Sequence, residues 1–195
     1  KLNLFNVSTT ATFILAGAGV TPVKHANRAV TSKSGGADLM AALGVKIDLA
    51  PERFTEVLKQ TGIGFLFAPV YHPAFKAVVP VRQELAKRGI RTVFNLLGPH
   101  LNPVQPEQQL IGVCDPAMLN QFADIMRGLG RKSGWVVCGK TKDGRRMDEV
   151  STVADTEVVS FVDGGAQSHS VLSPVDVGVL KEGDPLDALM GGRGE

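Results

Sequence analysis

Hydrophobic residues recur along this chain in two patterns, short apolar runs and longer amphipathic stretches. The runs at residues 20–24, 64–70, 108–114 and 134–140 are bounded by glycine, proline or polar residues and predict strands. Helical spacing predicts helices over residues 9–17, 36–43, 51–62, 73–88 and 116–130, and a short helical or irregular segment over 91–99. Residues 156–172 alternate around an Asp-Gly-Gly turn, which predicts a β-hairpin or meander.

Strands that alternate with helices of ten or more residues indicate an α/β fold. We expect a largely parallel central sheet flanked by helices, with an antiparallel edge. Residues 140–147 are rich in turn formers and are interpreted as a surface loop rather than a domain boundary. The whole chain, residues 1–195, is therefore expected to be a single α/β domain.

Composition narrows the classes of function. Hydrophobic residues make up 44% of the chain and charged residues 21%, as in an ordinary globular protein. The net charge of +2 gives no case for a general nucleic-acid binder, so any anion site must be local. Cys114 and Cys138 lie far apart, which disfavours a zinc site and fits a reducing cytoplasmic setting. No apolar run reaches 18 residues, so a membrane span is not expected.

Asn6, Ser8 and Thr9 stand where the first predicted helix begins. Free backbone N–H groups and the helix dipole favour an anion at such a position, and the two hydroxyls add donors. Simple capping of the helix is the alternative and the commoner role of such residues.

Residues 24–36 carry many hydrogen-bond donors between small residues. Lys24, His25, Asn27 and Arg28 follow a predicted strand, and Ser32 follows shortly after them. Open α/β sheets place ligands at the carboxyl ends of their strands, so this segment is interpreted as an anion cradle. A solvated basic loop is the alternative.

Asp148 and Glu149 are adjacent carboxylates after a basic turn. Side chains of neighbouring residues point to opposite faces of a regular strand, so both reach one site only if the backbone leaves strand geometry there. Paired carboxylate oxygens suit Mg²⁺, although two solvated acids in a turn are the commoner case. Arg82, Gly98 and Pro99 are not specific by themselves, and His72 is interpreted as structural.

Taken in order, several segments resemble the anthranilate phosphoribosyltransferase family. They are FNVSTTATFILAGAGVTPVKHANRAVTSKSGGADLMAALGV, GIGFLFAPVYHPAFKAVVPVRQEL, RTVFNLLGPHLNP, GVCDP and MDEVS. The resemblance implies that the amine of anthranilate displaces pyrophosphate from phosphoribosyl pyrophosphate (PRPP), with Mg²⁺ on the leaving group, in tryptophan biosynthesis. Such chemistry needs positioning and charge stabilisation rather than a catalytic nucleophile.

The resemblance also implies a role for individual residues. It assigns PRPP binding to Asn6, Ser8, Thr9, Lys24, Asn27, Arg28 and Ser32. It assigns anthranilate binding to His25, Asn27, Arg82, Gly98 and Pro99. It assigns magnesium binding to Ser8, Asp148 and Glu149. It further implies that the full-length parent is a homodimer.

The chain departs from the family pattern in several places. The family's glycine-rich turn and N-terminal helical domain would precede Lys1, and further helices would follow Glu195, so the chain is expected to be incomplete at both ends and poorly active alone. The segment GPHLNP, residues 98–103, differs from the common form beside the expected acceptor site. Two alternatives therefore stay open: a relative with another aromatic acceptor, and a non-catalytic nucleic-acid-binding relative.

Overall fold

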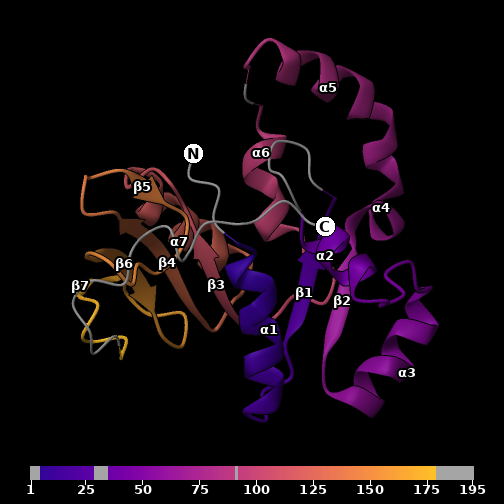
Figure 1. The fold of residues 1–195 in the computed structure, drawn as a ribbon, viewed down its shortest axis with the longest axis horizontal. Coiled ribbons are helices and arrows are strands. Elements are labelled where there is room, and N and C mark those ends of the chain that lie inside the picture. Colours follow the sequence, from indigo (N-terminus) through magenta and orange to yellow (C-terminus); the bar gives the residue numbers. More distant parts are fainter. Residues whose placement is uncertain (1–4, 29–34, 91, 179–195) are drawn as a thin grey trace. The chain divides into compact units, whose positions relative to one another are not determined.

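The protein is described by a computed structural model that covers residues 5–28, 35–90 and 92–178. Ser32, one of the predicted PRPP ligands, lies outside these residues. The chain divides into two compact units, a first unit of Asn6–Val104 and a second unit that begins at Gln105. Each unit is described by itself below and drawn in Figure 1.

The first unit is built around a two-stranded parallel sheet. Its register pairs Val23 with Gly64 and Ala26 with Phe67. In chain order its elements are α1 (Val7–Gly17), β1 (Val23–Ala26), α2 (Gly36–Ala42), α3 (Pro51–Thr61), β2 (Gly64–Phe67), α4 (Ala68–Tyr71), the 3₁₀ helix η1 (Pro73–Val78), α5 (Val79–Lys87), α6 (Phe94–Leu97) and the 3₁₀ helix η2 (Gly98–His100).

Helix α2 covers this small sheet with an apolar face. Ala37 and Met40 are almost fully buried and form a cluster with Ile47, against which the partly buried Phe65 and Phe67 of β2 pack. Burial of this cluster holds α2 against the sheet.

Prolines explain why two expected elements differ in the structure. The strand expected over residues 64–70 ends at Phe67, because Pro69 lacks the N–H that sheet pairing requires, and α4 follows. The single helix expected over residues 73–88 is instead η1 followed by α5. Pro80 lies in the first turn of α5, where its missing N–H costs nothing, whereas inside a continuous helix it would remove a hydrogen bond.

In the part of the chain that the structure describes, the second unit holds a five-stranded sheet and one helix. Its elements are β3 (Gln108–Gly112), α7 (Met118–Gly128), β4 (Ser133–Lys140), β5 (Arg146–Met147), β6 (Thr156–Phe161) and β7 (Ser168–Leu172). The strand order is β3-β4-β6-β7, and β5 pairs with the end of β4. Only β3 and β4 are parallel, and the other pairs are antiparallel.

The expected α/β class, with parallel and antiparallel strands, is confirmed, and the described strands are divided between two sheets. The expected hairpin over residues 156–172 is the β6–β7 pair. Part of the expected surface loop over residues 140–147 is different: Arg146 and Met147 pair with β4. The two paired segments flank the Asp143-Gly144 turn, a dipeptide that favours a local hairpin.

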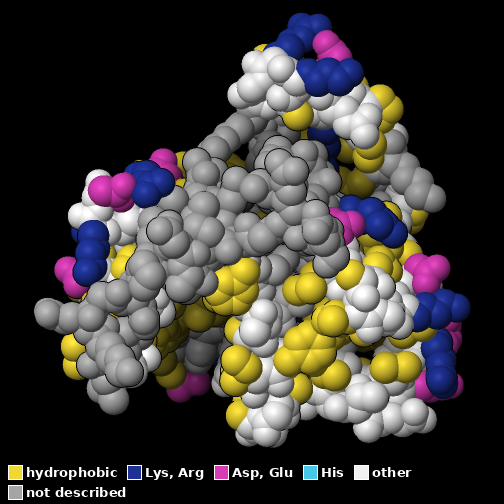
Figure 2. Space-filling model, in the orientation of Figure 1, with side chains coloured by type: hydrophobic (Ala, Val, Ile, Leu, Met, Phe, Trp, Pro, Cys, Tyr) yellow, Lys and Arg dark blue, Asp and Glu magenta, His cyan; other side chains and the backbone are white. Residues whose placement is uncertain are grey.

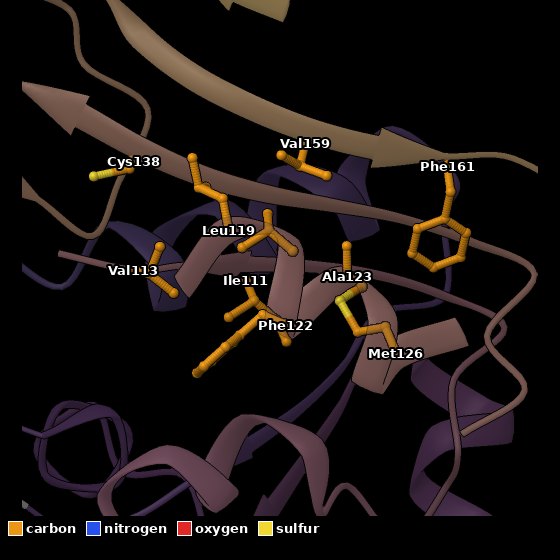
Figure 3. Packing of buried hydrophobic residues seen from close by; sticks show 10 residues of the cluster. Ile111, Val113, Leu119, Phe122, Ala123, Met126, Cys138, Val159 and Phe161 are labelled. Atoms are coloured by element: carbon orange, nitrogen blue, oxygen red, sulfur yellow. The ribbon is translucent and has the colours of Figure 1, made fainter. Parts of the chain in front are cut away.

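The main core of the second unit lies between the sheet and α7 (Figure 3). The helix contributes residues at the helical spacing i, i+3, i+4 and i+7, which are Leu119, Phe122, Ala123 and Met126. The strands contribute alternate residues, which are Ile111, Val113, Val136, Cys138, Val159 and Phe161. Across the described residues, no helix is both long and apolar enough to cross a membrane.

Candidate functional site

The start of α1 uses two of its polar residues for capping. The Asn6 side-chain oxygen accepts hydrogen bonds from the Thr9 backbone N–H, at 3.3 Å, and from the Thr9 hydroxyl, at 2.7 Å. Thr9 is fully buried. Asn6 and Thr9 thus stabilise the helix start, and Ser8 between them remains exposed and turned to another partner.

That partner comes from β1. The Lys24 ammonium group donates a hydrogen bond to the Ser8 hydroxyl, at 2.8 Å. Gly36, the first residue of α2, leaves room for this pair, because a Cβ there would lie 3.0 Å from the Thr9 hydroxyl and 3.3 Å from Lys24 Cε. The structure therefore brings together three of the predicted phosphate ligands, a cation and two hydroxyls, beside a helix N-terminus.

Asn27 and Arg28 lie exposed where β1 ends. The Arg28 guanidinium donates to the Asp38 carboxylate at 3.3 Å and lies 5.8 Å from the centre of the Phe67 ring. Asp38 also accepts from the Gly35 backbone N–H, at 3.0 Å. Asp38 of α2 thus binds both the Arg28 side chain and the backbone of Gly35, the residue before α2.

A cavity of about 150 Å³ opens on the other side of β1. Its lining residues are His25, Asn27, Ala68, Pro69, His72, Phe75, Val79, Arg82, Phe94, Gly98 and Leu101. All of them belong to the first unit. An apolar cavity of this size accepts one benzene-sized ring.

The rings of this cavity contact one another edge to face. The centroid distances are 5.0 Å for His25–His72, 5.6 Å for His72–Phe75 and 5.4 Å for Phe75–Phe94. The Arg82 guanidinium carbon lies 5.5 Å from the centre of the Phe94 ring, in a cation–π contact. An apolar wall with a few polar groups is the usual form of a small-molecule site.

Two imidazoles supply polar atoms to the cavity. Within the described residues, the Nε2 atoms of His25 and His72 are buried and have no hydrogen-bond partner. Burial lowers the pKa of His25, and the neighbouring His72 lowers it further, while a hydrogen bond to the Gly98 backbone opposes the shift. Neutral His25 is thus favoured, and an Nε2 atom that lacks a partner is available to a ligand.

The cavity gathers most of the residues predicted for the acceptor, namely His25, Asn27, Arg82 and Gly98. Pro99 is exposed and is not among the lining residues. Sequence reasoning missed His72, which it interpreted as structural, and the ring contacts of Phe75 and Phe94. The three-residue spacing of His72 and Phe75, on one side of a helical turn, was the available signal.

The predicted carboxylate pair lies in the second unit, directly after β5. Asp148 and Glu149 are half-buried and both lie in a bend, so the backbone does leave strand geometry where the pair required it. The described residues hold no group of three or more His, Cys, Asp or Glu side chains that could bind a metal. Two carboxylates nevertheless suit Mg²⁺, which commonly completes its shell with water and substrate phosphates.

The bend is anchored at both ends. Before it, Arg146 pairs with Glu157 of β6 at 2.6 Å, and this hydrogen bond is the main cause that lowers the pKa of the Glu157 carboxyl. After it, the buried Ser151 donates its backbone N–H to the Thr156 hydroxyl, at 2.8 Å, and its own hydroxyl to the Lys140 carbonyl, at 2.5 Å. Ser8, the third predicted metal ligand, belongs to the first unit.

Comparisons with known proteins agree in what they find. The family model described as "Glycosyl transferase family, a/b domain" matches residues 1–195. Curated relatives named anthranilate phosphoribosyltransferase include those of Azorhizobium caulinodans, 48% identical, and Chlorobaculum parvum, 44% identical. Each match covers 98% of this chain and 53% of the relative, so the chain spans about half the length of these relatives.

Solved structures are similar as well. The anthranilate phosphoribosyltransferase of Thermus thermophilus is 44% identical with a TM-score of 0.83, over 97% of this chain and 53% of that one. The enzyme of Saccharomyces cerevisiae, in complex with PRPP and Mg, is 30% identical with a TM-score of 0.80, over 97% of this chain and 50% of that one.

Proposed function

We propose that this chain is part of an anthranilate phosphoribosyltransferase. The premise is that the chain belongs to the glycosyl transferase family through its a/b domain. In the proposed reaction the amine nitrogen of anthranilate bonds to C1 of PRPP as the bond from C1 to the pyrophosphate oxygen breaks. The amine loses a proton, and the products are N-(5-phosphoribosyl)anthranilate and pyrophosphate. The observation that carries the proposal is the convergence of His25, Asn27, Arg82 and Gly98 on one ring-lined cavity.

The cavity suits anthranilate for chemical reasons. Its volume and its edge-on rings fit one flat aromatic ring. Arg82 enters from α5 and carries a planar guanidinium that can pair with a carboxylate through two parallel hydrogen bonds. Neutral His25 presents Nε2, which accepts a hydrogen bond from the attacking amine while the backbone at Gly98 holds the ring in place.

We assign the donor substrate to the opposite side of β1. Ser8 and Lys24 would hold the phosphates of PRPP, with Asn6 and Thr9 fixing the helix start beneath them. The ammonium charge and the free N–H groups at the start of α1 favour a phosphate there. Asn27 and Arg28, exposed at the end of β1, extend the same site, and Ser32 remains an expectation from sequence.

We assign Asp148 and Glu149 to magnesium, and the role of Ser8 as a ligand of this ion stays an expectation from sequence. Mg²⁺ bound there would neutralise charge on the departing pyrophosphate. The solved yeast relative is a complex with PRPP and Mg, which supports magnesium as the metal. The half-buried pair on an anchored bend offers the oxygen ligands that the ion prefers.

The complete gene product tests the proposal directly. Incubated with anthranilate, PRPP and Mg²⁺, it should consume anthranilate, followed as loss of anthranilate fluorescence, and the reaction should stop when PRPP or Mg²⁺ is omitted. Absence of turnover under all conditions would reject the assignment.

A second candidate is a family relative with another aromatic acceptor. Gly98 and Leu101, within the segment of residues 98–103 that differs from the common family form, both line the cavity. Competition of substituted benzoates against anthranilate separates the two candidates, since the true acceptor gives the highest kcat/KM.

The nucleic-acid-binding alternative is less well supported. On the face drawn in Figure 2, Lys and Arg side chains lie beside Asp and Glu side chains. Exposed ion pairs include Arg53–Glu56, at 2.6 Å, and Arg88–Glu84, at 3.0 Å. A phosphate-binding stripe requires unbalanced positive charge. A gel shift that is strong and sensitive to salt, without phosphoribosyl transfer, would favour this alternative.

We also propose that the chain acts within one α/β domain of a cytoplasmic homodimer in tryptophan biosynthesis. The family match over residues 1–195 supports one domain. Light scattering on the complete gene product tests the dimer, and rescue of a tryptophan-requiring strain tests the pathway.

A further inference from the structure

The bend that carries Asp148 and Glu149 lies directly on two glycines of the sheet. We propose that Gly112 and Gly139 are positioning residues, which set the location of the two carboxylates by letting the backbone of the bend rest on β3 and β4. This inference rests on the magnesium role assigned above.

The contact is with the backbone that bears the carboxylates. A Cβ built on Gly112 would overlap the carbonyl group of Asp148, and one built on Gly139 would overlap the carbonyl oxygen of Glu149. The Gly139 position would also bring a Cβ to 2.7 Å from Met147 Cγ. Backbone atoms cannot move aside as the end of a flexible side chain can, so any side chain at either glycine must displace the bend.

Both glycines lie on the same face of the sheet. Gly112 is the register partner of Val137, and Val137 and Gly139 are alternate residues of β4, so all three face one side. This is the face opposite the core of Figure 3, to which Val136 and Cys138 contribute. Val137 is fully buried although it lies outside that core, as expected if the bend and its flanks cover this face.

The ends of the bend restrict where it could move. Met147 pairs with Gly139 in the sheet before the bend, and the buried Ser151 is bonded to Thr156 and Lys140 after it. A shift forced by a new methyl group is therefore confined to the three residues between these anchors, the two carboxylates and Val150.

Magnesium makes such a shift measurable. The ion demands near-ideal octahedral geometry, so displaced ligands bind it less well. Changes in residues that orient metal ligands typically weaken metal affinity about 10- to 100-fold, and we expect that range for Gly112→Ala and Gly139→Ala.

The experiment measures metal binding without turnover. The complete gene product is mixed with PRPP and Mn²⁺ in the absence of anthranilate, and free Mn²⁺ is followed by electron paramagnetic resonance. Gly134→Ala is the matched control, because a Cβ there would meet the Phe161 ring at 2.7 Å, in the core on the opposite face. The Gly134→Ala variant should be less stable than the wild type, but its Kd for Mn²⁺ should stay within about 2-fold of the wild-type value. The Glu149→Gln variant should have a higher Kd for Mn²⁺.

The outcomes separate the inference from the proposed function. A raised Kd for Mn²⁺ in either glycine variant, with the Kd of Gly134→Ala unchanged, supports the positioning role. If Glu149→Gln raises the Kd and both glycine variants bind Mn²⁺ like the wild type, only the positioning role is overturned. If Glu149→Gln leaves the Kd unchanged, the magnesium assignment itself is wrong. If neither Gly112→Ala nor Gly139→Ala folds, the glycines serve folding alone and the positioning role is given up.

Discussion

Arg82→Lys tests the acceptor site most directly, because it keeps the positive charge and removes the planar fork. In the structure the guanidinium carbon lies 5.5 Å from the centre of the Phe94 ring and the side chain lines the cavity. A lysine would retain one hydrogen bond to the anthranilate carboxylate, lose the second one and make a weaker cation–π contact with Phe94.

The expected magnitude follows from these losses. A hydrogen bond to a charged group contributes about 1.5–3 kcal/mol, and an exposed cation–π contact about 0.5–1 kcal/mol. Since lysine recovers part of each, we expect a net loss of about 1.5–2.5 kcal/mol, which corresponds to a 10- to 60-fold fall in kcat/KM for anthranilate.

Steady-state fluorescence assays on the complete gene product, with anthranilate or PRPP as the varied substrate, measure the effect. The KM for PRPP should stay near the wild-type value, because Arg82 is not among the residues assigned to PRPP and Ser8 and Lys24, which would hold the phosphates, do not line the cavity. Arg88→Lys on the same helix is the matched control, since its side chain is 65% exposed and pairs with Glu84. An equal rise in both KM values, or an unchanged kcat/KM for anthranilate, would refute the reasoning.

Three further changes test local features of the first unit, each by urea denaturation. Asn6→Ala removes the helix cap and should lower the free energy of unfolding by about 1 kcal/mol, whereas Asn6→Asp should keep most of it; equal midpoints for both would contradict the capping role. Burial and His72 lower the pKa of His25 below its ordinary value of 6.5, so its contribution to stability is complete above pH 6.5 and falls as the solution is acidified. His25→Gln should flatten that fall, and an unchanged slope would argue against it. Gly64→Ala places a Cβ 2.8 Å from the Phe54 ring and should cost about 1–3 kcal/mol, partly restored by Phe54→Leu; no loss would show that the ring moves freely.

Elements with strong local periodicity were predicted well. The helix expected over residues 116–130 is α7, Met118–Gly128, because four buried side chains at helical spacing determine both the element and its buried face. The strand expected over residues 134–140 is β4, Ser133–Lys140, whose central residues are buried.

Features that depend on distant partners were not predictable from local pattern. The cavity joins His72 to His25, which lies far from it along the chain, and no local pattern specifies that contact. The contact of Gly112 with the Asp148 carbonyl was likewise not predictable. A glycine in an apolar strand indicates that another backbone can approach closely, but the sequence does not identify that backbone.

Neighbouring side chains of strand β1 face two different environments. Lys24 reaches the start of α1 and His25 faces the ring-lined cavity, because adjacent side chains of a strand leave on opposite sides. Under the proposed function, substitutions in the cavity lining could therefore change which amine is accepted during evolution. The side chains that bind the sugar phosphate would not have to change. The same alternation makes the register of β1 critical. A shift of the strand by one residue would turn Lys24 toward the cavity and His25 toward α1, and both sites would be lost.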